Sequence, residues 1–451
     1  MAIGTYLALA IREKPKPTEA RFLLFLGGRI VENQNNVCGS ILVVKFGGSS
    51  LANGEKISNA VKAVVKELGK GSRIAVVVSA MGKTTDFLLE AIKEAVNCEK
   101  MVCSTDVDDV LAMGERTSAR IFSVALKASG VKCRYFDPAD ADWPIITSDV
   151  PMNADPILEI CEERICKHVL PLLDKGFVVV VPGFVGKTLD GKITTMGRGG
   201  SDITAFVLAR ALKAKQVILV TDVDGIMTAD PKLVKSTRKI PQIDVNSLIG
   251  LAGSSQKFLQ KKALKYKEDW MDVKIISHAY CDLNVEGTVI KGSLTRNVAS
   301  VDFPEAIASI TIVGKGLSQS PEILHQVIQK LKSAEVQLLG FSANYDSLIM
   351  YVPESALDKI LEPLHSVVHD NPEAVAMAVR KNLSLIKVKR AGLEETPGVL
   401  GSLAKSLSME GMNIYGLFMV ASGIHVFVDR TRMKEALMVV RKALKEIMEA
   451  C

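Results

Sequence analysis

The chain is poor in aromatic residues and contains no pair of cysteines at the Cys-x-x-Cys spacing. Aromatic residues make up 5% of the 451 residues and the net charge is only +6, so the composition argues against nucleic-acid binding, which usually combines clustered basic residues with aromatic ones. The eight scattered cysteines argue against a zinc finger or a redox pair and favour a reducing, cytoplasmic setting. No apolar run approaches the ~20 residues that cross a bilayer, so no membrane span is expected.

What is present is the composition of an ordinary globular protein, with 48% hydrophobic and 24% charged residues. The length corresponds to about three domains. Residues 1–40 are predicted to be an extension, because the apolar stretch Leu7–Ile11 is too short for the core of a signal peptide. His365 and His369 stand four residues apart without an acidic catalytic partner, so an exposed helix face is expected there and no metal site.

Strands and helices alternate over the first two thirds of the chain. The apolar run Ile41–Phe46 ends in Gly-Gly and predicts a buried strand, followed by a helix at 55–68 and a strand at 74–78. The alternation continues with a helix at 117–128, a strand at 177–181, a helix at 201–212 and a strand at 217–220. This order predicts a three-layer αβα fold around a mostly parallel sheet, with ligands at the carboxyl ends of the strands.

From about residue 305 the sequence repeats itself. Pro321 and Pro397 are 76 residues apart, and the same offset aligns Gly316-Leu317 with Gly392-Leu393 and Gly340 with Gly416. Each copy predicts a strand, a helix that Pro initiates, two strands and a second helix. Two small βαββαβ domains are therefore expected, at 305–380 and 384–451, after a first domain at 41–296.

Two glycine-containing segments follow the first two strands. In Lys45-Phe46-Gly47-Gly48-Ser49-Ser50, backbone amides next to glycine can converge on an anion with a lysine beside them, although such a segment is often only a tight turn. The segment 79–86 contains Gly-Lys-Thr, but the first glycine of a P-loop would fall on Val77, so a P-loop is excluded. A polar loop that presents hydroxyl groups, or one that only caps the next helix, remains.

The segment Gly197-Arg198-Gly199-Gly200-Ser201-Asp202 carries the strongest signal. Glycine-rich entries to helices bind anions, and Arg matches a carboxylate with two parallel hydrogen bonds, whereas the alternative is a capping Asp beside a surface Arg. Glu115 is expected near the start of a helix, where a carboxylate usually interacts with the helix dipole. The Asp-rich turn at 221–225 does not by itself distinguish a functional site from an ordinary turn after a strand. Lys257 adds a candidate phosphate-binding cation.

Together these motifs resemble the aspartate kinases of the amino acid kinase superfamily. The matches are KFGGSS at 45–50, VSAMGKTTD at 78–86, GERTS at 114–118, GRGGSD at 197–202 and TDVDGIMTADP at 221–231. The repeat, with Glu395-Thr396-Pro397-Gly398, is similar to a tandem pair of ACT regulatory domains. The resemblance spans residues 41–451 in the family's order, and it implies the amino acid kinase fold followed by two ferredoxin-like domains.

The resemblance also implies roles for individual residues. Lys45 would hold the transferring phosphoryl group and Asp202 would organise that lysine. L-aspartate would be bound by Ser79, Thr85, Glu115, Arg198, Gly199, Gly200 and Ser201. ATP would be bound by Lys45, Phe46, Gly47, Gly48, Thr221, Asp222, Met227, Lys232 and Lys257, with Mg²⁺ arriving on the nucleotide rather than in a protein cage. Met227 and Lys232 depart from the Tyr and Arg that are common in the family.

The ACT pair implies feedback regulation by lysine or threonine and a homodimer or higher oligomer formed through these domains. Ser320 and Gln337 are candidate effector residues, but Glu322 and Gln337 depart from the usual Gly and Asn of the first copy. Two other functions stay open. The chain could phosphorylate glutamate, a carbamate or a nucleotide, or it could be a regulatory subunit without catalysis.

Overall fold

A mostly parallel sheet organises the first part of the chain in the computed structural model, which describes residues 39–96, 104–251, 259–294, 298–301, 303–389, 397–420 and 423–449. Within these residues the strand order is β3-β4-β2-β1-β7-β9-β10-β8, and only β9 and β10 are antiparallel neighbours. The strands are β1 (Ile41–Phe46), β2 (Arg73–Val78), β3 (Cys133–Tyr135), β4 (Val178–Pro182), β7 (Gln216–Thr221), β8 (Gln242–Asp244), β9 (Asp272–Ser277) and β10 (Thr288–Lys291). A hairpin of β5 (Val185–Lys187) and β6 (Ile193–Thr195) lies outside this sheet.

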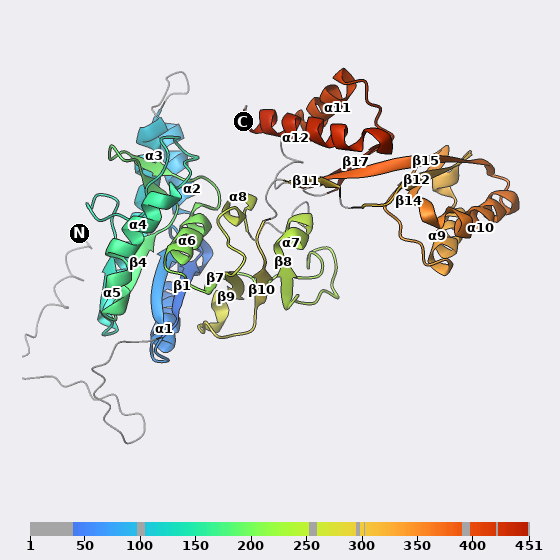
Figure 1. Cartoon of the computed structure of the whole chain (residues 1–451). Helices are drawn as coiled ribbons and strands as arrows, with labels where there is room; N and C mark the ends of the chain where they lie inside the picture. Colours follow the sequence, from blue (N-terminus) through green and yellow to red (C-terminus); the bar gives the residue numbers. More distant parts are fainter. Residues whose placement is uncertain are drawn as a thin grey trace, which may run out of the picture. The chain divides into compact units, whose positions relative to one another are not determined.

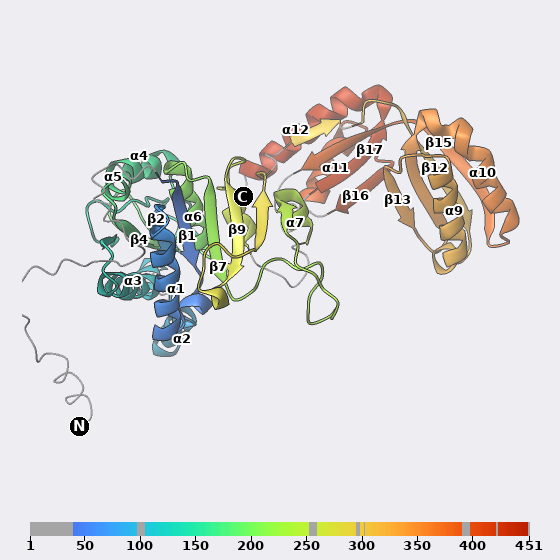
Figure 2. The ribbon, with the colours of Figure 1, turned by 90° about the horizontal axis from the view of Figure 1, so that it is seen from below.

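Helices cover both faces of this sheet because its central strands are apolar on both sides. Val43 and Val77 pack with α4 and α6 in one core, and their neighbours Val44 and Val76 pack with α1 and α3 in a second core. Figure 2 shows α1 and α3 on one side of the strands and α4 and α6 on the other. The helices are α1 (Gly54–Leu68), α2 (Thr84–Ala95), α3 (Ser104–Ala128), α4 (Leu158–His168), α5 (Leu170–Asp174), α6 (Gly200–Ala211), α7 (Val245–Leu251) and α8 (Lys261–Leu264). The predicted three-layer αβα fold is confirmed.

One helix is much longer than expected. The prediction placed a helix at 117–128 with Glu115 near its start, but α3 begins at Ser104, so Glu115 lies in the middle of the helix. The buried positions Val107, Leu111 and Ala112 continue the helical periodicity upstream of Gly114. The prediction for Glu115 as a first-turn residue was therefore wrong, and its carboxylate is too far along α3 to interact with the helix N-terminus.

The C-terminal part forms one antiparallel sheet from both copies of the repeat (Figure 1). Its central strand, β15 (Ala374–Lys389), runs unbroken through the expected boundary at 380–384, pairing with β12 along its first part and with β17 along its second. The strands are β11 (Val298–Val301), β12 (Ile307–Gly314), β13 (Gly340–Ala343), β14 (Ser347–Pro353), β15, β16 (Gly416–Val420) and β17 (Gly423–Asp429). The helices are α9 (Pro321–Ser333), α10 (Leu357–Asp370), α11 (Val399–Met409) and α12 (Met433–Glu449).

The two copies meet at an aromatic contact. The rings of Tyr351 on β14 and Phe427 on β17 stack with centroids 3.8 Å apart, and the hydroxyl of Tyr351 donates to the Tyr415 carbonyl at 2.6 Å. Gly416 tolerates no side chain, because an added Cβ would lie 2.3 Å from that hydroxyl. The copies thus share both a strand and a small core, while the exact domain boundaries remain a prediction.

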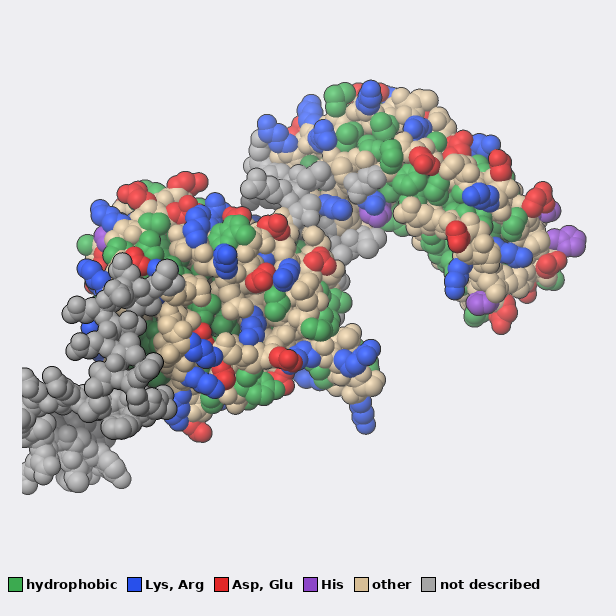
Figure 3. All heavy atoms as spheres, turned by 60° about the horizontal axis from the view of Figure 1, so that its bottom comes forward, with side chains coloured by type: hydrophobic (Ala, Val, Ile, Leu, Met, Phe, Trp, Pro, Cys, Tyr) green, Lys and Arg blue, Asp and Glu red, His purple; other side chains and the backbone are tan. Residues whose placement is uncertain are grey.

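Basic and acidic side chains are interspersed over the face drawn in Figure 3. In the described part of the chain, no helix combines the length and apolar character that a bilayer crossing requires.

Candidate active site

The predicted motifs meet at one edge of the sheet, at the carboxyl ends of neighbouring parallel strands. Phe46 of β1 pairs with Val78 of β2 and Val220 of β7, and Val78 pairs in turn with Pro182 of β4. Because these strand ends are in register, the segments that follow them emerge side by side. This is the place where open α/β sheets bind their ligands.

The Gly47–Gly48 turn is held between two neighbouring strand ends. The Gly47 amide donates to the Val220 carbonyl at 2.9 Å, and the Gly82 amide donates to the Gly48 carbonyl at 2.9 Å. A Cβ on Gly48 would lie 2.9 Å from the Ala80 carbonyl oxygen and 3.0 Å from that of Gly82. Close approach of two backbones therefore requires glycine at position 48.

Lys45 and Asp202 form the central ion pair of the site. The Lys45 ammonium lies 2.7 Å from an Asp202 carboxylate oxygen, and the two side chains are only 16% and 9% exposed. Lys45 belongs to β1, whereas Asp202 lies in the first turn of α6, which Gly199 begins in a left-handed conformation (φ 81°). A cation and a helix N-terminus are thus brought together, which is an arrangement that attracts anions.

The segment after β2 contacts both α6 and α3. The Ser79 hydroxyl donates to the Ser201 hydroxyl at 3.0 Å. Gly114 on α3 packs against the same segment, since a Cβ there would lie 2.9 Å from the Ala80 Cβ and 3.7 Å from the Thr85 hydroxyl. Ser79 and Ser201 are therefore in direct contact, and Thr85 lies on the same segment as Ser79, against α3.

Glu115 is buried beside this segment, with 4% of its surface exposed. Burial raises the pKa of its carboxyl to about 7, although a hydrogen bond from the Ala80 backbone and the positive charge of Lys45 oppose the rise. Its Oε2 atom has no hydrogen-bond partner among the described residues. A buried carboxylate with a free acceptor next to a lysine is suited to receiving a cationic group.

Arg198 differs from these residues because it is exposed. It stands between Gly197 (φ 70°) and Gly199 (φ 81°), which both adopt the left-handed conformation that favours glycine. No ion pair of Arg198 is found within the described part of the chain. The guanidinium is available to a ligand, and the loop that carries it is shaped by glycine on both sides.

The remaining nucleotide-binding candidates lie at the end of β7 and in the segment that follows it. The Thr221 hydroxyl donates to the Asp222 carboxylate at 3.1 Å, Met227 pairs with Lys239 in an isolated bridge, and Lys232 is exposed. Lys257 lies outside the described residues.

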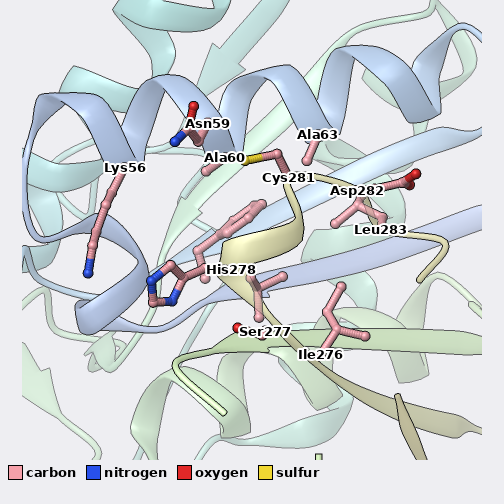
Figure 4. A pocket seen from close by; sticks show the side chains of 12 residues that line it. Lys56, Asn59, Ala60, Ala63, Ile276, Ser277, His278, Cys281, Asp282 and Leu283 are labelled. Carbon is pink, nitrogen blue, oxygen red and sulfur yellow. The ribbon is translucent and has the colours of Figure 1, made fainter. Parts of the chain in front are cut away.

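Sequence reasoning missed His278, which directly follows β9 at the same edge. Its Nδ1 lies 2.9 Å from the Thr221 carbonyl oxygen and 3.5 Å from the Ser50 hydroxyl, and that hydroxyl donates to the Val220 carbonyl at 3.1 Å. His278 also lines a pocket between α1 and the end of β9, where Figure 4 shows it near Lys56. The signal was available, because the stretch 273–276, which is apolar except for Lys274, is followed directly by Ser277 and His278.

The two effector candidates are not brought together within one chain. Ser320 immediately precedes α9, whereas Gln337 follows its far end and is exposed. The 13 residues of α9 separate them by about 20 Å of helix. A single small molecule therefore cannot contact both Ser320 and Gln337 of the same chain.

Comparison with known proteins identifies relatives of this chain. The model of the amino acid kinase family matches residues 40–277. Aspartokinase 2 of Bacillus subtilis is 30% identical over 381 residues, which cover 83% of this chain and 90% of that protein.

Solved structures show the same fold. Aspartate kinase from Synechocystis superposes with a TM-score of 0.74 at 24% identity, over 90% of this chain and 69% of that one. Two structures of E. coli aspartokinase III, one with aspartate and ADP and one with lysine and aspartate, each give a TM-score of 0.50 at 21% and 22% identity, over 90% of this chain and 99% of theirs.

Proposed function

The chain belongs to the amino acid kinase family, in which its relatives along most of its length are aspartokinases, and from this premise we propose how it acts as an aspartate kinase. It transfers the γ-phosphoryl group of ATP to the side-chain carboxylate of L-aspartate, yielding 4-phospho-L-aspartate and ADP. The observation that carries the proposal is the Lys45–Asp202 pair beside the Gly47–Gly48 turn, with buried Glu115 adjoining. The product is the first intermediate on the route to lysine, threonine and methionine.

The chemistry needs cations more than it needs a base. The acceptor carboxylate is already ionised at neutral pH, so no proton has to be removed. A bond forms between that oxygen and the γ-phosphorus while the bond to the β–γ bridging oxygen breaks, and ADP leaves with those electrons. The obstacle is the repulsion between two anions, which Lys45, the amide of Gly48 and the Mg²⁺ carried by ATP reduce.

Aspartate is gripped by both ends of its backbone. Glu115 accepts the α-ammonium, which supplies the counter-charge that its buried carboxylate lacks. Arg198 binds the α-carboxylate bidentately, assisted by Gly199, Gly200 and Ser201. Ser79 and Thr85 complete the pocket, so that the side-chain carboxylate points toward the nucleotide.

The nucleotide occupies the carboxyl ends of β1 and β7. Phe46, Gly47 and Gly48 surround the phosphates together with Lys45, and Thr221, Asp222, Met227, Lys232 and Lys257 line the remainder of the site. Crystallographic binding of aspartate and ADP by E. coli aspartokinase III supports this choice of substrates.

The C-terminal repeats act as an ACT pair that regulates the enzyme allosterically. The shared β15 and the alternating order of strands and helices support this assignment, as does the lysine complex of E. coli aspartokinase III. Because Ser320 and Gln337 lie at opposite ends of α9, an effector that touches both must lie between two copies of the chain. Lysine or threonine should therefore inhibit a dimer or higher oligomer. A monomer by light scattering, with activity that neither amino acid changes, would contradict this.

The decisive experiment traps the acyl phosphate. Incubation with ATP, Mg²⁺, L-aspartate and hydroxylamine should produce aspartyl hydroxamate. A product formed with glutamate but not with aspartate would overturn the substrate assignment, and effector binding without any ATP turnover would establish a regulatory subunit instead.

A further inference from the structure

Two charged residues beneath the Arg198 loop, one buried and one half-buried, take no part in the reaction proposed above. They are Asp108 of α3 and Lys262 of α8. We propose that Asp108 and Lys262 are positioning residues that clamp the loop around Arg198 from below and thereby set the affinity for the amino-acid substrate. The inference rests on the proposed role of Arg198 and deepens it.

Asp108 gathers donors from two segments that are distant in sequence. Its side chain is completely buried. The backbone amide of Met152 donates to both carboxylate oxygens at 3.1 and 3.0 Å, and the Thr195 hydroxyl donates to Oδ1 at 2.5 Å. Thr195 is the last residue of β6 and stands three residues before Arg198. A buried carboxylate holds its donors firmly in place, because the loss of any of these hydrogen bonds would leave part of its charge uncompensated.

The Met152 segment transmits this contact to the Arg198 loop. Met152 adopts a left-handed conformation (φ 60°), which is unfavourable for a non-glycine residue and therefore needs the support that Asp108 supplies. The Met152 carbonyl lies directly under Gly197, where an added Cβ would approach it to 2.9 Å. A displacement of Met152 would therefore shift the residue adjacent to Arg198.

Lys262 supplies the complementary half of the clamp. Its ammonium donates to the carbonyl oxygens of Asn153, Ala154 and Met196, each at 3.1 Å, and to the Asn153 side chain at 2.8 Å. It also lies 3.3 Å from an Asp155 carboxylate oxygen and is only 19% exposed. The same two segments are thus joined through their amide and hydroxyl donors by Asp108 and through their carbonyls by Lys262.

The clamp connects the two groups that hold aspartate. Asp108 and Glu115 stand seven residues apart on α3, which is two helical turns, and both are buried. The distance from Glu115 to the Arg198 loop is consequently set through Asp108. Gln260, two residues before Lys262, packs against the other end of the loop, where a Cβ on Gly199 would lie 2.6 Å from the Gln260 Cβ.

The test uses Asp108→Asn and Lys262→Met, which retain size but remove charge. Each should raise KM for aspartate about tenfold or more while KM for ATP changes less than about twofold, because only the amino-acid side of the site is displaced. Lys262→Arg should recover most of the affinity, since a guanidinium also offers several donors to carbonyls. Asp109→Asn, on the same helix as Asp108, and Lys265→Met, directly after α8, alter exposed neighbours and should leave both constants unchanged.

A milder variant keeps the test decisive if a charge substitution prevents folding. Thr195→Val removes one hydrogen bond and should raise KM for aspartate severalfold without changing KM for ATP. Unchanged KM for aspartate in folded Asp108→Asn and Lys262→Met, or an equal rise for both substrates, would overturn the clamp. Wild-type formation of aspartyl hydroxamate together with such a result would leave the proposed function intact, whereas absence of hydroxamate from the wild type would refute the function itself.

Discussion

Lys45 and Asp202 come from β1 and α6, and the 2.7 Å ion pair between them joins the first glycine-rich turn to the helix that follows the Arg198 loop. Both side chains are largely shielded from water, so the pair is screened less than a surface ion pair. The lysine to which we assign phosphate binding is therefore held in place by a residue of the segment to which we assign aspartate binding.

Asp202→Asn should lower kcat while the protein stays folded. The amide keeps the size of the side chain but lacks the negative charge that pairs with the Lys45 ammonium, and a charged hydrogen bond contributes about 1.5–3 kcal/mol, or roughly 10- to 100-fold in rate. Steady-state release of ADP measures the effect. Asp190→Asn, on an exposed turn, serves as the control. An unaltered kcat would show that Asp202 does not organise Lys45 for catalysis.

Arg198→Ala should reduce kcat/KM for aspartate by about 2–4 kcal/mol, because it deletes a charge-assisted contact with the substrate. Arg198→Lys should give an intermediate value, since lysine keeps the charge but not the planar fork. Arg198 is exposed, so the melting temperature should stay unchanged in both variants. Equal activity of the alanine variant and the wild type would remove Arg198 from the site.

Glu115 should make aspartate binding depend on pH near neutrality. Burial raises the pKa of its carboxyl from 4.5 to about 7, and only the ionised form attracts the substrate ammonium. KM for aspartate should therefore fall as the pH rises from 6 to 8, and Glu115→Gln should abolish this pH dependence together with most of the affinity. A pH profile of KM that is the same in both proteins would contradict the assignment.

The same residue should reduce stability in the absence of substrate. Because its folded-state pKa lies above the unfolded value, the destabilisation grows as the pH rises from 4.5 to about 7 and is complete above that. At pH 8 the free energy of unfolding of Glu115→Gln should therefore exceed that of the wild type by on the order of 2–3 kcal/mol, with little difference at pH 4.5. Denaturant titrations at the two pH values measure this difference. If the variant is less stable than the wild type at pH 8, other groups of the protein must stabilise ionised Glu115 even without substrate.

Gly48→Ala should impair both stability and activity. The added methyl group would meet two backbone carbonyl oxygens at 2.9 and 3.0 Å, and neither can move without displacing the segment after β2. A loss of about 1–3 kcal/mol in the free energy of unfolding is expected. The matched control is Gly54→Ala in the first turn of α1, where a Cβ has open space and should be neutral or stabilising.

The sequence alone predicted the three-layer αβα fold, which the structure confirms, and it predicted a candidate site at the carboxyl ends of the strands. The strand Ile41–Phe46 was predicted to the residue, because an apolar run that ends in Gly-Gly has few alternatives. The Pro321 helix, the repeat and the gathering of five motifs at one sheet edge likewise follow from local patterns. Such features depend on residues close in the chain, and parallel strands necessarily bring their carboxyl ends together.

Only the tertiary structure decided where charged groups lie, how far they are buried and how their pKa values are shifted. Glu115 looked like the start of a helix, yet its position inside α3 and against Ala80 buries it and raises its pKa. Asp108 and Lys262 carried no signal in the sequence, since the residues they bind, Met152, Thr195 and Met196 among them, are distant in sequence. Desolvation and hydrogen bonding depend on which segments meet in space, and no local pattern encodes those meetings.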